Sequence, residues 1–146
     1  RQLTAVIGAL PESVTLEELP SSFPGLKATL LHIWNAEAVW WQRLRLTENP
    51  RFPGDTFSGS TAALIQELLV QSKQWEEWAA GVSPLMLAHV IQYYTRKQEP
   101  AKMQTGQLAL HVFNHSNFHR GQLVTMLRQA GIKKIPATDF LLWVKK

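Results

Sequence analysis

The chain has 146 residues, of which 45% are hydrophobic and 18% charged, and its formal net charge is +4. A typical domain has about 150 residues, so we expect a single domain over residues 1–146 with a sizeable core. This composition excludes a disordered or collagen-like chain. No apolar run approaches the ~18 residues of a membrane-spanning helix and no secretory signal is visible, so we expect a cytoplasmic protein with no membrane partner.

The chain contains no cysteine. A disulfide, a thiolate metal site and a cysteine nucleophile are therefore excluded, and any metal must be held by nitrogen and oxygen atoms. Most of the positive charge lies near the end, because residues 133–146 carry four Lys and one Asp whereas residues 1–132 are nearly balanced. A short terminal patch of this kind is typical of a solvated tail, so we expect no nucleic-acid partner.

Apolar residues recur at helical spacing through the first half of the chain. They predict the end of a first helix over Arg1–Leu10, where Pro11 stops it, and a polar link after it. A second helix begins near Pro24, because proline suits a first helical turn, and runs to about Leu46. The segment Asn49–Gly59 holds two Pro and two Gly, so it is predicted to be a loop.

The third helix follows Ser58 or Ser60 as its N-cap and ends at Gly81, which suits the left-handed position after a helix. The segment His89–Gln104 has a different pattern. It contains β-prone residues on both sides of the Glu99-Pro100 turn, and it predicts a small hairpin.

The last long helix is predicted to run from a Thr105 cap to Ala130, with Gly131 as its stop. After Pro136, Thr138 is a possible cap for a short helix that carries Phe140, Leu141 and Trp143. Three helices of about 20 or more residues and a shorter first one predict an all-α fold. The expected architecture is an antiparallel four-helix bundle with a small hairpin before the last long helix.

The six Trp residues are explained by core packing. On the second helix Leu30, Trp34 and Trp41 share one face, and Trp75 and Trp78 are neighbours on the third. Bulky aromatic rings at helical spacing are typical of a bundle core, so we prefer this interpretation to a ligand platform.

The last long helix has an apolar face whose middle is polar. The residues that share this face at 100° per residue are Leu108, His111, Val112, His115, His119, Gln122, Leu123 and Met126. Burying a polar group without a partner costs about 1–3 kcal/mol, so the polar patch requires a compensating interaction. A bound metal ion is one candidate.

His115 and His119 stand one helical turn apart, so both imidazoles can converge on one ion. A pair at this spacing also arises by chance, and a single helical His is usually a hydrogen-bonded core or surface residue. A zinc-protease helix is excluded, because Ser116 stands where such a helix has Glu. His111 lies two turns from His119, about 12 Å along the axis, so one ion cannot easily bridge them.

A third ligand must come from another segment, where His32 and His89 are the remaining histidines. We choose His32, because its small neighbours on the second helix leave room for an ion, whereas His89 lies near the hairpin. Glu37 lies about 140° around the helix from His32, so it is more plausibly a structural carboxylate or a support for the ligands than a fourth ligand.

Two stretches resemble a known family. The run Asn114-His-Ser-Asn-Phe-His-Arg-Gly-Gln122 and its continuation to Gly131 resemble the signature of the DinB/YfiT-like metalloenzyme family. The upstream segment Leu30–Glu37 resembles the helix that carries the first ligand in that family, and the ending Pro136–Trp143 also fits. The likeness covers about residues 10–143, and its most specific part is the His-Arg-Gly-Gln string.

The resemblance implies a four-helix bundle in which His32, His115 and His119 hold one divalent ion, usually nickel or zinc. It makes His111 a neighbour of the site and not a ligand. It also implies a homodimer and a relationship to thiol-dependent S-transferases and isomerases. The family name refers to induction by DNA damage, which describes expression and not DNA binding. One departure is the short first helix, which puts the covering of its outer face and the dimer surface in doubt.

Three neutral imidazoles around a divalent ion leave a position open for water or for a thiol, and the ion lowers the pKa of either. With no cysteine in the chain, a thiol has to be a small-molecule substrate. Three hypotheses follow: a thiol-dependent transferase or isomerase, a hydrolase that uses metal-bound hydroxide, and a non-catalytic bundle that binds metal or a partner protein. The family resemblance favours the first.

No residue is assigned as a general base. Gln122, one turn beyond His119, is expected to orient a ligand or to satisfy a buried group. Arg120 points about 100° away from His119, which favours a structural role or a place at a dimer surface. Asn35, about 60° from His32, is a candidate support for the site.

Overall fold

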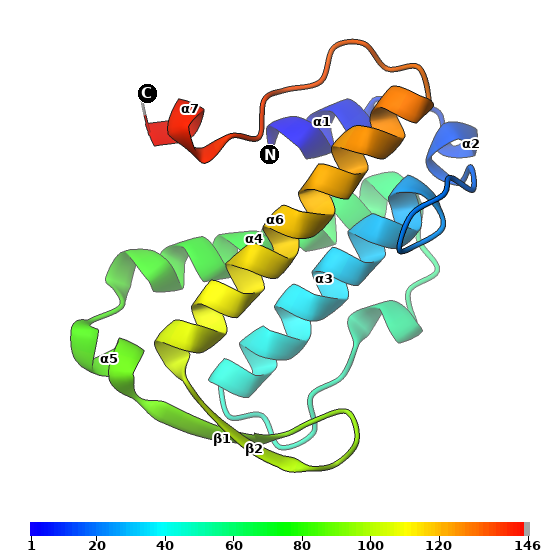
Figure 1. Ribbon diagram of the computed structural model, residues 1–146. Helices are drawn as coiled ribbons and strands as arrows, with labels where there is room; N and C mark the ends of the chain where they lie inside the picture. Colours follow the sequence, from blue (N-terminus) through cyan, green and yellow to red (C-terminus); the bar gives the residue numbers. More distant parts are fainter. Residues whose placement is uncertain (145–146) are drawn as a thin grey trace.

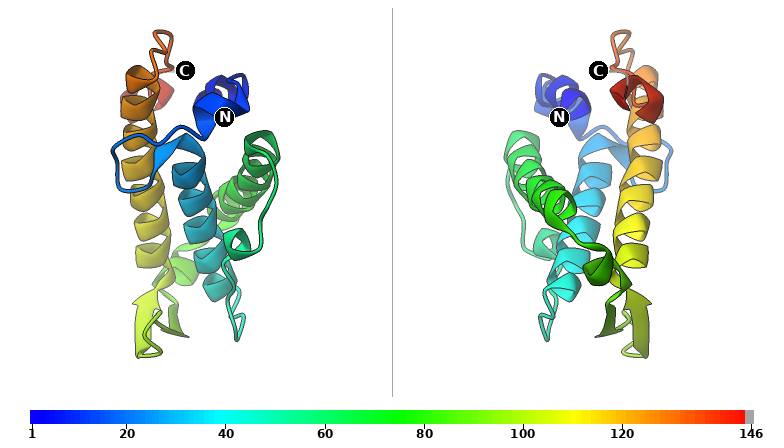
Figure 2. Two further views of the ribbon diagram at one scale, coloured as in Figure 1. Left: turned by 90° about the vertical axis from the view of Figure 1, so that its right-hand side faces the viewer. Right: turned by 90° about the vertical axis from the view of Figure 1, so that its left-hand side faces the viewer.

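The computed structural model describes residues 1–144 and is dominated by three long helices. These are α3 (Gly25–Leu44), α4 (Thr61–Gly81) and α6 (Thr105–Gln129). Helix α3 lies between the other two and packs against both, with α6 running antiparallel beside it and α4 crossing obliquely (Figures 1 and 2). The mostly helical fold predicted from the sequence is therefore confirmed.

Short elements connect and cover the long helices. They are α1 (Gln2–Gly8), α2 (Glu12–Thr15), the 3-10 turn η1 (Pro53–Asp55), α5 (Pro84–Ala88), β1 (Val90–Tyr94), β2 (Pro100–Gln104) and α7 (Phe140–Val144). The two strands pair antiparallel, with Val90 opposite Gln104, and form the hairpin expected before the last long helix. None of the helices in the described range is long and apolar enough to cross a membrane.

The helix ends confirm some of the predicted caps and correct others. Ser60 is the N-cap of α4, and its hydroxyl accepts the Ala63 N–H at 3.2 Å. Gly81 is the last helical residue and not a left-handed stop, because the chain continues into an extended Val82. Gly131 does adopt a positive φ of 80°, as expected after α6.

The start of α6 is capped by a residue other than the one predicted. Gln104 and Gln107 form a capping box in which each side chain bonds the other's backbone N–H, so Thr105 is the first helical residue. The Thr105 hydroxyl instead donates to the Met86 carbonyl and ties α6 to α5. At α7, the Leu141 N–H is accepted by Asp139 Oδ1 and not by Thr138.

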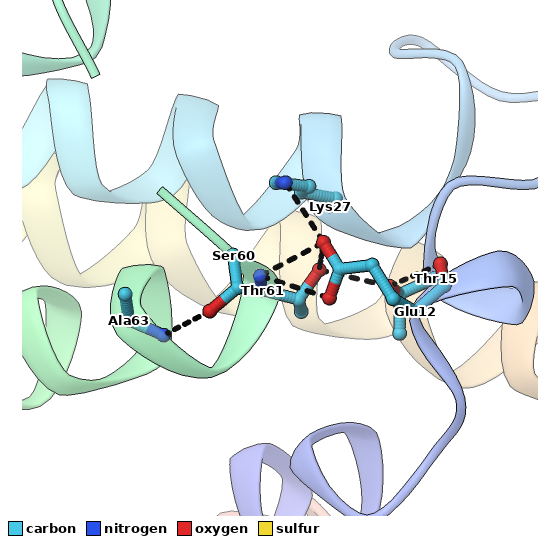
Figure 3. Close-up of polar contacts among 6 residues, drawn as sticks. All are labelled: Glu12, Thr15, Lys27, Ser60, Thr61 and Ala63. Carbon is cyan, nitrogen blue, oxygen red and sulfur yellow. Dashed lines mark hydrogen bonds and ion pairs between the residues drawn. The ribbon is translucent and has the colours of Figure 1, made fainter. Parts of the chain in front are cut away.

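Helix α2 was not predicted, because its segment has few apolar residues, and it positions a carboxylate at the N-terminus of α4. Glu12 accepts the Thr61 N–H at 3.0 and 3.1 Å and the Lys27 ammonium at 2.9 Å (Figure 3). A carboxylate at a helix N-terminus satisfies free N–H groups and opposes the positive end of the helix dipole. Glu12 thereby joins α2, α3 and α4.

The core has two parts. The larger is formed by α1, α3, α4 and α6 and includes Leu30, Trp34 and Leu127. The smaller contains Trp75, with Trp41 and Trp78 packed edge-on against it at 5.2 and 5.8 Å between ring centroids. Trp34, Trp41, Trp75 and Trp78 are thus packing groups, as expected from their spacing.

Glu37 is a buried carboxylate that connects the three long helices. It accepts the Ser72 hydroxyl of α4 at 2.7 Å and the Ser116 hydroxyl of α6 at 2.8 Å. Its backbone carbonyl accepts the Trp75 indole N–H at 3.1 Å. Burial raises the pKa of Glu37, and the two serine hydrogen bonds offset that effect only in part. The sequence left two roles open for Glu37, a structural carboxylate or a support for the ligands, and the structural role is observed.

We expect Glu37→Gln to gain stability relative to the wild type as pH rises. Because the pKa of Glu37 is raised on folding, its contribution to stability is greatest below the unfolded pKa of 4.5 and is lost as pH rises through the folded pKa. Gln carries no charge, so it avoids this loss. Urea unfolding at about pH 4.5 and about pH 7.5, with chelator present, measures the change.

Glu67→Gln, at an exposed position on α4, is the matched control and should show no comparable trend. A Glu37→Gln protein whose relative stability stays constant or falls as pH rises would contradict the prediction.

Candidate metal centre

Three histidines from two helices meet at one point. His32 comes from α3, and His115 and His119 come from successive turns of α6. One ring nitrogen of each lies within 4.8 Å of those of the other two. The structure therefore brings together the three histidines selected from the sequence, in a cluster that could hold a metal ion.

The spacing of the ring nitrogens suits a shared ion. His32 Nε2 and His115 Nε2 are 3.0 Å apart. Two nitrogens bound to one tetrahedral zinc at its usual bond length stand about 3.3 Å apart, so this pair is already near the separation of two ligands. The ligand nitrogen of His119 lies within 4.8 Å of those of the other two.

His119 is held in one orientation by a chain of polar contacts. Its Nδ1 lies 2.7 Å from Gln122 Oε1, and Gln122 Nε2 donates to Ser22 Oγ at 2.7 Å. Since an amide oxygen can only accept, His119 carries its proton on Nδ1 and leaves Nε2 free as a ligand. This arrangement is typical of metal-binding histidines. Gln122 thus satisfies and orients a ring nitrogen, one of the two roles expected for it.

His32 and His115 are in the protonation state that a metal requires. Burial, together with the neighbouring His119 and His115, lowers the pKa of His32 from 6.5 to about 4. Burial is also the main cause that lowers the pKa of His115. Both imidazoles are therefore neutral near pH 7, with lone pairs available for an ion. His115 Nδ1 is buried and has no hydrogen-bond partner among the described residues.

The sequence contained no signal for Phe23 and Ser22, which complete the surroundings of the cluster. The Phe23 ring stacks on His32 with 3.9 Å between centroids and an interplanar angle of 24°. Ser22 accepts the hydrogen bond from Gln122. Both lie in the loop before α3, where an isolated Ser or Phe has no periodic pattern. Only the folded chain places this loop over the cluster.

The remaining candidate residues lie outside the cluster. His111 is exposed and packs against Trp40 with 5.1 Å between ring centroids, so the predicted buried stripe is interrupted there. His89 is exposed at the end of α5. Arg120 is exposed and donates to Asn117 at 3.3 Å.

Asn35 supports a loop beside the cluster. Its Oδ1 accepts the Gly54 N–H at 2.7 Å, and a Cβ on Gly54 would lie 2.6 Å from Asn35 Nδ2. A side chain at this position would displace the Asn35 amide, so glycine permits the close approach of the loop to Asn35. Asn35 anchors the loop Arg51–Thr56 to α3 and is not itself part of the histidine cluster.

A cleft of about 400 Å³ opens beside the cluster. His32 and His115 line one part of it, and Asn35 and Asp55 lie on the side of the anchored loop. The hairpin contributes further lining residues. The volume is in the range of small-molecule sites, so a ligand of modest size could contact His32 and His115 from this cleft.

Comparison with known proteins decides the family. The DinB family model matches residues 1–145. The chain belongs to the DinB family. It is 28% identical over 149 aligned residues to protein DinB of Bacillus subtilis (strain 168), covering 92% of this chain and 81% of that protein.

The crystal structure of a DinB-like protein from Bacillus cereus ATCC 10987 has the same fold. The TM-score is 0.71 at 18% sequence identity, over 94% of this chain and 89% of that chain. The DinB-like fold is therefore shared, and in this chain it includes a two-stranded hairpin before the last long helix. The resemblance drawn from the motif around His115 and His119 is confirmed at the level of family and fold.

We expect Asn35→Ala to loosen the loop of this DinB-family protein without removing the histidine cluster. Losing the acceptor for the Gly54 N–H should cost about 1 kcal/mol. Amide hydrogen exchange at Gly54 should become faster, whereas α6 amides should exchange as before. Asn49→Ala, at an exposed loop position, is the control. Unchanged protection at Gly54 would refute the anchoring role of Asn35.

Proposed function

We propose that this protein is a metal-dependent enzyme in which His32, His115 and His119 hold one divalent ion, zinc or nickel. In this proposal a small-molecule thiol is the nucleophile in an S-transfer or isomerisation reaction. The observation that carries the proposal is the convergence of three imidazole nitrogens beside an open cleft. Such an ion supplies Lewis acidity, which lowers the pKa of a thiol or a water molecule bound to it.

The residues around the cluster suit a functional site better than a closed structural one. Structural zinc sites in proteins usually have four protein ligands, whereas the described residues provide three. Gln122 fixes the orientation of His119, and Phe23 limits movement of the His32 ring. These side chains hold the ligand set rigid while the cleft admits a substrate.

The choice of a thiol rests on the family and on the composition of the chain. Because the protein has no cysteine, the thiol must come from a small molecule. Hydrolysis is the alternative reaction at the same cluster, and a metal- or partner-binding role without catalysis is a third. The lining of the cleft includes one carboxylate, Asp55, among the residues described. No other side chain there is a carboxylate base, which agrees with activation by an ion.

The homodimer implied by the resemblance stays a prediction. Leu110, Phe113 and Phe118 of α6 and most of α7 expose apolar side chains. These residues would be the first candidates for a subunit interface.

Replacing one proposed ligand should remove the metal. We expect elemental analysis of the untagged protein to find one equivalent of divalent metal, and His115→Ala to lose most of it. Gln122→Ala should keep the ligands but bind metal about 10–100-fold more weakly, because His119 loses its fixed orientation.

His89→Ala is the matched control, since His89 is exposed and outside the cluster. Its metal content should equal that of the wild type. Equal metal content in wild type and His115→Ala would refute the proposed site.

Thiol dependence tests the reaction class. The metal-loaded protein is assayed with a haloarene electrophile and small thiols, in a reaction that forms a C–S bond, releases halide and transfers the thiol proton to solvent. The wild type should accelerate this reaction, and His115→Ala should not. Hydrolysis of esters or amides without any thiol would favour the alternative reaction. No activity beyond that of His115→Ala in either assay would favour a non-catalytic role.

A further inference from the structure

The cleft beside the histidines contains an arginine that no carboxylate neutralises. Arg43 of α3 lines the cleft and is only partly exposed. Its guanidinium lies over the Trp40 ring at 4.4 Å and the Tyr93 ring at 4.9 Å from the centroids. Among residues 1–144 it forms no ion pair. Its single hydrogen bond is to the Tyr94 carbonyl at 3.0 Å, and Nε is buried without a partner.

A partly buried cation without a counter-ion is unfavourable. Burial lowers the pKa of Arg43, which shows that its surroundings disfavour the charge, although a guanidinium stays protonated in proteins. The aromatic faces of Trp40 and Tyr93 offset part of this cost. An anion that entered the cleft would compensate the charge more fully, because guanidinium–carboxylate hydrogen bonds are among the strong ones.

A second arginine faces the same cleft. Arg96, between β1 and β2, lies over the Phe52 ring at 5.3 Å and has no ion-pair or hydrogen-bond partner within the described chain. Arg43 and Arg96 therefore present two positive charges from different elements. Asp55 is the one opposing charge among the described lining residues, and it is exposed on the 3-10 turn.

The arginines and the histidines occupy different parts of one cleft. Arg43 follows His32 by about three turns of α3, roughly 16 Å along the axis. Side chains of a helix lean toward its N-terminus, so the guanidinium reaches back toward His32. An extended tripeptide spans about 10 Å, which is a suitable length for a ligand that contacts both parts.

We propose that Arg43 and Arg96 form a carboxylate-binding subsite, so that the cleft takes an elongated, anionic small molecule. The carboxylate binds the two arginines, the middle of the ligand lies along Trp40, and its reactive group reaches His32 and His115. This inference deepens the proposed function, because it assigns a substrate class to the same site. A thiol of tripeptide size with free carboxylates fits this description.

Binding of thioether probes tests the subsite independently of the reaction. S-methylglutathione keeps the carboxylates of such a thiol but has no sulfur proton, and its diethyl ester also lacks the carboxylates. By calorimetry on the full-length protein as purified, we expect the ester to bind at least about tenfold more weakly than the acid. Arg96→Gln and Arg43→Gln should each weaken binding of the acid about tenfold.

Further controls separate loss of the arginine charge from misfolding and from loss of metal. Arg43→Lys, which keeps the charge, should bind better than Arg43→Gln. Removing metal from the wild type with a chelator should leave binding of the thioether within about twofold, because the arginines remain. Arg45→Gln, an exposed neighbour outside the cleft, is the matched control and should leave binding unchanged.

The proposal is overturned if acid and ester bind equally, or if Arg96→Gln binds as the wild type does. It is also overturned if neither S-methylglutathione nor glutarate binds at millimolar concentration. Failure of the proposed thiol chemistry appears separately, as absent turnover of thiols by a protein that still binds the thioether.

Discussion

The site depends on the register between α3 and α6. These antiparallel helices are tied by the hydrogen bond from Ser116 to the buried Glu37 carboxylate, and Ser116 follows His115 directly. A shift of either helix by one turn would break this bond and separate His32 from His115 and His119. The Ser72 hydroxyl links the same carboxylate to α4, so one acidic group of α3 is hydrogen-bonded to both other long helices.

Burying a carboxylate at this point is costly unless it is hydrogen-bonded, and the raised pKa of Glu37 shows that the cost is only partly offset. The presence of a buried charged or polar group of this kind does not by itself show that the fold is more stable. Its value here lies in specifying one alignment of the helices. Within that alignment, His32 of α3 faces His115 of α6, and Gln122 and Phe23 contact the neighbouring rings.

The cleft has an imidazole and a guanidinium group along one helix, α3. His32 lies near its beginning, Arg43 near its end, and small or aromatic side chains lie between them. The loop anchored by Asn35 and the hairpin with Arg96 form the other walls. Both walls lie outside the long helices.

The sequence determined the long helices and the hairpin, because these depend on local periodicity, and it indicated His115 and His119, because their motif spans two helical turns. The choice of His32 rests on its small neighbours and on the family resemblance, and the folded chain decided that it joins the other two. The sequence also excluded thiolate chemistry from the chain itself. Tertiary structure alone decided which caps are used, with Gln104 in place of Thr105 and an extended chain after Gly81, because small differences between neighbouring residues settle helix ends. It likewise decided the contacts of Phe23, Ser22, Arg43 and Arg96, which come from separate segments. Residues far apart in sequence leave no periodic signal, so only the folded chain brings their charges and rings together.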